Sequence, residues 1–520
     1  MMSFHPYGTR WPTVRRREFI TSAAGLATLL AAQGRAASVG TAPIPAAIPA
    51  VDWSGKPITL AGADVKDLRA RLGGGVLIAQ DPEWQSARKI WNGAFDRKPA
   101  LIARCRNTAD VVAAVQFAHA NKLLTAVRSG GHSISGQSSV DGGIMIDLSL
   151  MRGIRVDAKA KTASVDGGVL LGELDAACQA QGLVTTLGTA ADTGIAGLTL
   201  GGGQGRLMRK FGLTCDNVRG LELVTADGKV LNVSAQQNPD LFWALRGGGG
   251  NFGIVTRFEY QLHALAHPVI AGSRVYALDQ TATVLGAVRD MIRGSSDELC
   301  LSSGISNMPA GTSPLPGGHY PTIEFIHCGT AADAAKALAQ LDKLGKPLLD
   351  DIVSKPYVKA QLGASGAAPP ALPPGLGVYV RSGFLNEMPD ALIGEFIRVA
   401  KAAPAWWDGI YFGWQSGAVE RVAPTATAYW NRGSQFEFIL SAVWTDHTQD
   451  AANVALMEKT WEPMQPYTRG YYVNTEPSAT EQRLRATYGD NYSRLVAIKN
   501  RYDPDNLFRR NANIRPTGKA

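Results

Sequence analysis

Residues 127–136, with the sequence VRSGGHSISG, place a single histidine, His132, among three glycines and three serines. Glycine lets the backbone approach a ligand closely, and consecutive free N–H groups can bind phosphate oxygens. A loop histidine taken alone is usually a solvated surface residue. The stretch therefore predicts a ligand-binding turn only if other glycine-rich blocks accompany it.

The composition is that of a large globular protein. A chain of 520 residues with 45% hydrophobic residues can bury a large core and should divide into two or more domains. Its 57 glycines occur in clusters rather than in a repeat, which favours backbone packed against a ligand over a fibrous or disordered chain. Half of the net charge of +8 lies within residues 1–36, so the charge provides no argument for a nucleic-acid partner.

The N-terminal segment RRREFITSAAGLATLLAAQGRAAS, residues 15–38, has a basic start, a short apolar run and small residues at its end. This pattern is typical of a secretory signal, and the apolar run is too short to span a membrane. The pair Arg16-Arg17 followed by Glu18 and Phe19 resembles a twin-arginine export signal. We expect a signal peptide at 1–37, contact with the twin-arginine export machinery, no membrane anchor, and a periplasmic or secreted protein. A basic disordered tail or a lipid-facing anchor is the alternative.

The cysteines and histidines indicate neither a disulfide framework nor a metal site. The five cysteines form no CxxC pair and are odd in number, so we expect core thiols. Among the histidines only His263 and His267 have helical i,i+4 spacing, and they lie where the pattern predicts a strand followed by a loop. We therefore expect no metal.

The chain from residue 99 onward alternates helical and strand patterns, which predicts an α+β fold. Thr108 is the expected N-cap of an amphipathic helix, and Gly182 should end a second helix. Asp227-Gly228 marks a hairpin turn. Strands are expected at 123–127, 142–148, 162–165 and 253–262, with a short helix at 238–246. Before residue 95 only a Pro/Ala-rich lead-in and one short helix are expected.

A tempting dinucleotide-binding motif is rejected. Gly248, Gly250 and Gly253 match GxGxxG letter for letter. Here the helical segment precedes the glycines and the strand follows them, whereas a Rossmann fold needs strand, glycines and then helix.

Five blocks together carry a family resemblance: residues 127–136, 142–157, 193–218, 238–262 and 501–516. In this order they resemble the FAD-linked oxidases of the berberine bridge enzyme-like group, in the vanillyl-alcohol oxidase superfamily. The resemblance implies a PCMH-type, two-subdomain FAD-binding domain at 95–267, after a lead-in at 38–94. An α+β substrate domain at 268–465, an antiparallel sheet covered by helices, is inserted before a C-terminal segment, 466–520, that returns to the FAD domain.

The resemblance also implies how FAD is held. His132 takes the position that forms a covalent bond to the flavin 8α-methyl group, whereas Ala190 stands where some members have a second, cysteinyl link. A single covalent link through His132 is therefore expected. Thr193 matches the position that controls oxygen access, and its size favours oxygen as acceptor. The cofactor-binding positions are Arg128, Ser129, Gly130, Gly131, His132, Ser133, Thr193, Gly194, Gly197, Gly202, Gly203, Gly205, Asn217, Gly253, Ile254, Val255, Asn511 and Asn513.

The substrate half is marked by residues 436–441. Phe436, Phe438 and Leu440 alternate with Glu437, Ile439 and Ser441, the period of a strand with two different faces. The resemblance implies that Glu437 points toward the flavin as a base, and the apolar Ile439 departs from the family pattern. A surface glutamate on an edge strand is the alternative.

Two further residues are candidates near the C-terminus. The resemblance places Tyr472 in the substrate pocket, followed by Asn474, although Thr475 replaces a tyrosine of the family. Glu476 is a second candidate base. The catalytic candidates are thus Glu437, Tyr472 and Glu476.

These residues suggest an FAD-dependent oxidase that transfers hydride from a CH–OH group of a small molecule, a sugar or another alcohol, and releases hydrogen peroxide from O2. The nearby Trp414, Trp430 and Trp444 suit a polyhydroxy or aromatic substrate. A cyclic-amine C–N oxidase of the same fold is one alternative. A flavin electron-transfer protein without O2 reactivity is another.

Overall fold

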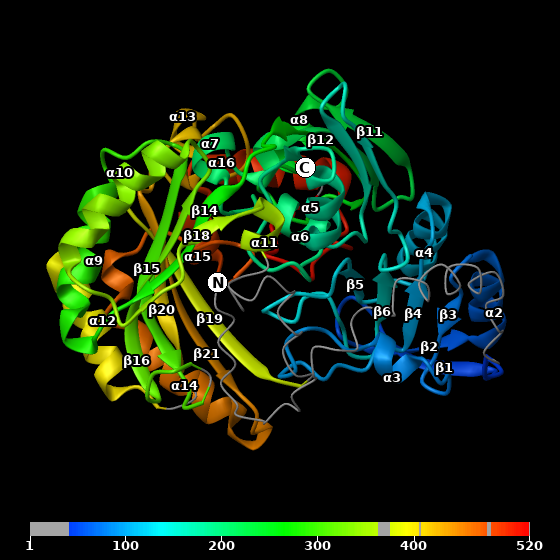
Figure 1. Ribbon diagram of the computed structural model, residues 1–520. Helices are drawn as coiled ribbons and strands as arrows, with labels where there is room; N and C mark the ends of the chain where they lie inside the picture. The colour runs from blue at the N-terminus through cyan, green and yellow to red at the C-terminus, as the bar shows by residue number, and fades with distance from the viewer. Residues whose placement is uncertain (1–40, 312, 362–374, 405–406, 476–479, 519–520) are drawn as a thin grey trace, which may run out of the picture.

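The computed structural model describes residues 41–311, 313–361, 375–404, 407–475 and 480–518. It has the expected mixed α+β architecture. A large sheet covered by helices forms one lobe, and two smaller sheet-containing units form the other (Figure 1). The expected signal peptide and most of the Pro-rich segment 366–377 lie outside the described residues.

The first unit of the smaller lobe is a four-stranded sheet in the order β3 (Val76–Leu77), β4 (Leu101–Arg104), β6 (Ile144–Asp147), β5 (Thr125–Arg128). Strands β4 and β5 both pair with β6 in parallel, so the chain must cross over, and α4 (Thr108–Ala120) makes that crossover. The N-cap of α4 is Asn107, whose side chain accepts from the Asp110 N–H, and not the expected Thr108. The glycine-rich turn follows β5 directly and leads toward β6.

The lead-in is more structured than expected. It forms a hairpin of β1 (Ala47–Val51) and β2 (Pro57–Ala61), then α2 (Gly62–Arg71) and α3 (Trp84–Ala87). Ile48, Leu60 and Leu68 pack in one hydrophobic core with Leu101 and Val111. The lead-in therefore shares one hydrophobic core with the first unit, and the domain boundary at residue 95 stays a prediction.

The second unit is a five-stranded antiparallel sheet in the order β11 (Val230–Ser234), β10 (Val218–Val224), β12 (Ile254–Gln261), β8 (Thr162–Asp166), β7 (Ile154–Asp157). Leu484, Tyr488 and Leu495 of the C-terminal helices α15 (Glu481–Tyr488) and α16 (Asn491–Tyr502) are buried in its core. The C-terminal segment thus returns to this lobe (Figure 1). Shorter elements around it are α5 (Leu171–Gln179), β9 (Leu183–Val184), α6 (Ile195–Leu200), α7 (Met208–Phe211), the 3₁₀ turn η2 (Thr214–Asn217), α8 (Pro239–Ala244) and β13 (His263–Ala264).

The large lobe contains an antiparallel sheet in the order β17 (Leu349–Asp350), β14 (Val269–Val275), β16 (Gly318–His327), β15 (Leu299–Met308), β20 (Trp407–Trp414), β21 (Phe436–Trp444), β19 (Gly377–Leu385), with β18 (Val353–Lys355) also paired to β14. Helices α9 (Thr281–Ile292), α10 (Ala331–Leu341), α12 (Asp390–Ala402) and α14 (Asp450–Trp461) cover one face (Figure 1). Two short helices, α11 (Tyr357–Gln361) and α13 (Ala418–Arg421), lie toward the smaller lobe. The other face of the sheet is left for the functional site.

Strand β21 has the two faces that its alternation predicts. Phe436, Phe438 and Leu440 belong to the core beneath the helices, whereas Glu437 and Ile439 line a cavity on the opposite face. Because β21 pairs with both β20 and β19, it is an interior strand, and Glu437 is only 3% exposed. The alternative of a surface glutamate on an edge strand is wrong.

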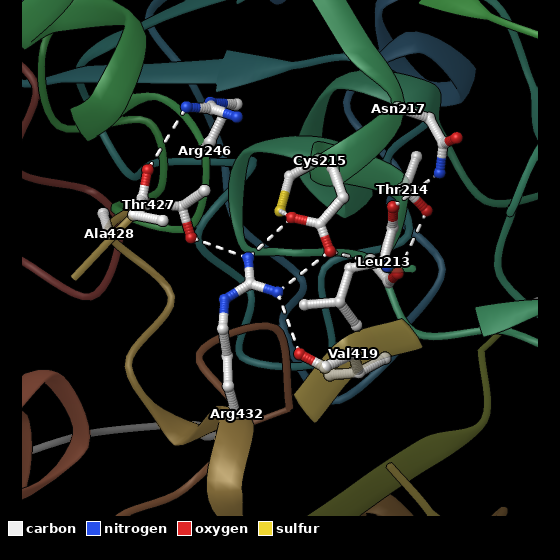
Figure 2. A network of polar contacts seen from close by, with 12 residues as sticks. Leu213, Thr214, Cys215, Asn217, Arg246, Val419, Thr427, Ala428 and Arg432 are labelled. Atoms are coloured by element: carbon white, nitrogen blue, oxygen red, sulfur yellow. Dashed lines mark hydrogen bonds and ion pairs between the residues drawn. The ribbon is translucent and has the colours of Figure 1, made fainter. Parts of the chain in front are cut away.

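A buried ion pair joins the two lobes (Figure 2). The fully buried Arg432 guanidinium donates to both carboxylate oxygens of Asp216, at 2.6 and 2.9 Å, and to the Thr427 hydroxyl at 2.7 Å. Asp216 also accepts from the Leu213 N–H at 2.9 Å, which closes the turn η2. This bidentate pair holds the turn against the segment that leads into β21.

All five cysteines are free thiols, as expected. Cys105, Cys178, Cys215 and Cys328 are buried, whereas Cys300 is half-buried and lines the cavity.

Within the described ranges, no group of three or more histidine, cysteine or acidic side chains is arranged to hold a metal ion. No helix in the described part of the chain is long and apolar enough to cross a membrane.

Candidate functional site

A cavity of about 550 Å³ lies between the open face of the large sheet and the loops of the smaller lobe. Its volume is in the range of cofactor and ligand pockets. The sheet contributes Ser302, Glu324, Tyr411, Glu437 and Ile439, and the opposite wall consists largely of glycine-rich loops. The site is thus assembled from segments far apart in the sequence.

Two glycine loops form part of the wall by direct backbone contact. A Cβ added to Gly130 would lie 2.4 Å from the Gly194 nitrogen, and one added to Gly194 would lie 2.2 Å from the Gly130 nitrogen. Gly131 has φ +72°, a conformation that side chains rarely adopt. Gly130 is therefore required by the approach of the two loops at the cavity, and Gly131 by its backbone conformation.

His132 follows this contact and lines the cavity. Its imidazole stacks on the Trp91 ring, with centroids 4.3 Å apart and planes at 22°. Its Nε2 atom lies 3.4 Å from Asp192 Oδ1. The His132 hydrogen bond is the main cause that lowers the pKa of Asp192.

Most of the cofactor-binding residues expected from the sequence meet at the cavity. Those that line it are Ser129, Gly130, Gly131, His132, Ser133, Thr193, Gly194, Gly197, Gly205, Gly253, Ile254, Val255 and Asn511. They come from five separate loops and strand ends of the smaller lobe. Ala190, which stands in place of a second attachment residue, lines it too.

Five of the expected cofactor residues do not line the cavity. The Asn217 amide donates to the Phe211 and Leu213 carbonyls at 3.0 and 2.9 Å, and its oxygen lies 2.6 Å from His263 Nε2, so it stabilises a turn. Arg128 donates to the Ala87 carbonyl instead. The others, Gly202, Gly203 and Asn513, are also outside the lining; the first two pack against Tyr429 and Thr214.

Glu437 is the acidic side chain at the centre of the sheet wall. Burial raises the pKa of its carboxyl to about 8, and hydrogen bonds from the Gln204 and Ser382 side chains oppose that shift. One carboxyl oxygen, Oε1, is buried without a hydrogen-bond partner among the described residues. A carboxyl tuned to this range can act as a general base near neutral pH.

Tyr472 lies at the same cavity, 6% exposed. Its hydroxyl oxygen accepts from the Gly203 N–H at 3.0 Å, the Gln204 N–H at 3.4 Å and the Asn474 amide at 2.8 Å. Burial, and then the charge of Glu437, raise the pKa of this phenol. With its oxygen so occupied, the hydroxyl hydrogen is left to donate. The candidate base Glu476 lies outside the described residues.

The substrate-domain wall contains residues that sequence reasoning missed. Cys300, Ser302 and Glu324 line the cavity from the large sheet, Arg206 lines it from the smaller lobe, and Ser302 donates to Glu324 at 2.9 Å. Trp414 also lines it, whereas Trp430 and Trp444 do not. Alternation along residues 299–308 and 318–327 is the signal that could have identified these two strands, which pair with each other; their outer partners, β20 and β14, are distant in sequence.

The cavity fits a large polar cofactor. Among the described residues, Ser138 Oγ, Arg510 Nε and Asn511 Oδ1 are buried without a hydrogen-bond partner, and all three residues line it. Buried polar atoms without partners are costly, and bound ligands commonly satisfy them. Together with the glycine loops, they suit the hydroxyl, carbonyl and phosphate groups of FAD.

The two-lobed α+β fold and the cavity agree with what the comparisons with known proteins show, that the chain is an FAD-linked oxidoreductase. An FAD-binding-domain family model matches residues 99–234, and a berberine and berberine-like model matches residues 471–515.

Relatives and a solved structure agree. The chain is 31% identical to (R)-6-hydroxynicotine oxidase of Paenarthrobacter nicotinovorans, over 86% of this chain and 97% of the relative. It is 28% identical to a chitooligosaccharide oxidase of Gibberella zeae, over 83% and 90%. The crystal structure of 6-hydroxy-D-nicotine oxidase from Arthrobacter nicotinovorans superposes with a TM-score of 0.75 at 29% identity, covering 85% of this chain and 98% of that one. The chain belongs to the berberine bridge enzyme-like family of FAD-linked oxidoreductases.

Proposed function

We propose that the protein is an oxidase that removes hydride from a CH–OH carbon of a small molecule, a sugar or another alcohol, and releases hydrogen peroxide from O2. The observation that carries the proposal is the pairing of Glu437 and Tyr472 at one cavity. A buried carboxyl and a phenol with a free hydrogen are suited to accept and orient the proton of an alcohol. The relationship to a chitooligosaccharide oxidase supports this substrate class.

FAD held by the glycine loops would supply the redox chemistry, accepting hydride and passing electrons to oxygen. The residues of the chain would position and deprotonate the alcohol. Glu437 would accept the hydroxyl proton at its unpaired Oε1. Tyr472, oriented by the Gly203 and Asn474 donors, would donate a hydrogen bond to the substrate oxygen. Trp414, which lines the cavity, would exclude water from the bound substrate.

His132 would hold the FAD through a single covalent bond to its 8α-methyl group. Its place beside the Gly130–Gly194 contact supports this, as does Ala190, whose methyl side chain cannot form a second link. Thr193, at the cavity wall, would leave room for oxygen.

A C–N oxidase acting on a cyclic amine is the second candidate. The relationship to 6-hydroxynicotine oxidase favours it. With a pKa raised to about 8, Glu437 would be mostly protonated at neutral pH, which suits an amine pocket that needs no base.

A substrate panel tests these functions. Purified protein is supplied with sugars, simple alcohols and cyclic amines, and peroxide release is measured. Peroxide with the alcohols or sugars supports the proposal, and peroxide only with amines supports the second candidate. Silence throughout, with rapid reduction of dyes, would instead support a flavin electron-transfer protein.

We also propose export by the twin-arginine pathway to the periplasm or the medium, on the basis of Arg16-Arg17 and the apolar run that follows. Replacing both arginines by lysine should retain the protein in the cytoplasm. Unchanged export of that variant would contradict the assignment.

A further inference from the structure

The imidazole of His132 is held on two sides by residues that its own turn does not contain. Trp91, from the lead-in, stacks on the ring with centroids 4.3 Å apart. Asp192, from the loop that approaches the glycine turn, lies 3.4 Å from Nε2. The His132 side chain is 16% exposed, so these contacts restrict a mostly buried ring.

The segment that carries Trp91 is fixed between the two lobes. The Trp91 N–H donates to the Gly131 carbonyl at 2.9 Å, which ties it to the residue before His132. Asn92 donates to the carbonyls of Ile134 and Val378 at 2.6 and 2.8 Å and accepts from the Val378 N–H at 3.0 Å. The ring plane of His132 is therefore set by a segment bonded to both the glycine turn and strand β19.

We infer that Asp192 is the positioning residue and proton acceptor for attachment of FAD to His132, and that Trp91 fixes the orientation of the ring. The inference rests on the proposed tether. With Nε2 turned toward Asp192, the second ring nitrogen, Nδ1, is the one available for bonding. A carboxylate at Nε2–H favours the tautomer with a free electron pair on Nδ1. The lowered pKa of Asp192 keeps its carboxylate ionised, so that it can accept the hydrogen bond of Nε2–H.

The attachment step balances as follows. Nδ1 gives its electron pair to the 8α carbon, one C–H bond of the methyl group breaks, and that proton leaves to solvent. The Nε2 proton passes by way of the partly exposed Asp192 carboxylate to solvent. The two electrons left on the ring system go to molecular oxygen, which takes up two protons and leaves as hydrogen peroxide. The net reaction joins the methyl carbon to the imidazole and consumes one O2.

The test measures acid-stable flavin in the full-length protein. The wild type, Asp192→Asn and Asp192→Glu are produced in flavin-poor cells and incubated with FAD in air, and the flavin in the acid pellet is followed with time. Asp192→Asn should attach FAD at least about tenfold more slowly, in line with loss of a general base. Asp192→Glu should recover part of the rate. Trp91→Ala should also slow attachment, and Trp91→Phe, which keeps a stacking ring, should do so less.

The matched control is Asp505→Asn, which removes an exposed aspartate 3.1 Å from Nε2 of His119. It should attach FAD at the wild-type rate. Non-covalent binding is measured separately, as FAD that stays with the protein in gel filtration but is released by acid. Asp192→Asn should still bind FAD in this way. Attachment by Asp192→Asn at the wild-type rate would overturn the inference, as would complete loss of FAD binding by that variant.

The flavin content of the wild type distinguishes failure of this inference from failure of the proposed function. Wild-type protein with only dissociable FAD would overturn the tether and this inference but leave the oxidase proposal standing. Wild-type protein that binds no FAD would overturn the proposed function.

Discussion

Glu437→Gln combined with a pH profile tests the assignment of the base. Burial raises the pKa of Glu437 to about 8, so its ionised fraction is roughly one tenth at pH 7 and roughly nine tenths at pH 9. If the ionised carboxylate takes the substrate proton, the rate of substrate-dependent flavin reduction should rise about tenfold over that range. The measurement is anaerobic stopped-flow bleaching of the flavin at saturating substrate.

The variant removes the base but keeps the shape of the side chain. Glu437→Gln should reduce that rate on the order of 10²-fold at pH 9 and lose the rise with pH. In the wild type the raised pKa favours the neutral carboxyl in the folded state, so its contribution to stability is intact below about pH 4.3 and declines as the pH rises through 8. Glu437→Gln should therefore resist urea at least as well as the wild type at pH 9. A flat wild-type profile, or a wild-type rate in the variant, would refute the assignment.

Three further predictions concern oxygen and stability. Thr193→Leu should slow reoxidation by O2 roughly tenfold, about 1.4 kcal/mol in the barrier, and leave anaerobic reduction unchanged; equal slowing of both steps would contradict a role in oxygen access. Lys499→Met leaves the fully buried Asp503, now 2.6 Å from the lysine nitrogen, without its partner, so urea unfolding should show a loss of about 3–5 kcal/mol. Arg432→Met removes the buried partner of Asp216 and should lower the free energy of unfolding by a similar amount. Its control, Arg485→Met in an exposed pair, should lower it by less than about 1 kcal/mol. Equal losses for Arg432→Met and Arg485→Met would contradict a stabilising contact between the lobes.

Local patterns allowed part of the fold and site to be predicted from the sequence. Alternation along residues 436–440 identified a two-faced strand, and the structure places its polar face at the cavity. The glycines at 130 and 194 are predicted to let the backbone approach a ligand, and in the structure they let the two loops that line the cavity contact each other. The alternation of a strand and the conformational freedom of glycine are properties of one or a few residues, so the local sequence is enough to predict them.

The remainder depends on contacts between distant residues. The β1–β2 hairpin was missed because Pro49 and the surrounding alanines are poor strand formers, and pairing and packing against the first unit override that preference. Asn217 was assigned to the cofactor because it lies in a glycine-rich block, yet its hydrogen bonds close a turn. The contacts of Trp91 and Asp192 with His132 join three segments, and no local pattern reveals them.

The central claim is that His132 holds FAD covalently in the glycine-lined cavity. The most direct measurement is acid precipitation of purified wild type and His132→Ala, followed by the flavin spectrum of pellet and supernatant. We expect the wild-type pellet to be yellow and the His132→Ala flavin to appear in the supernatant. A colourless wild-type pellet would contradict the claim, as would acid-stable flavin in His132→Ala.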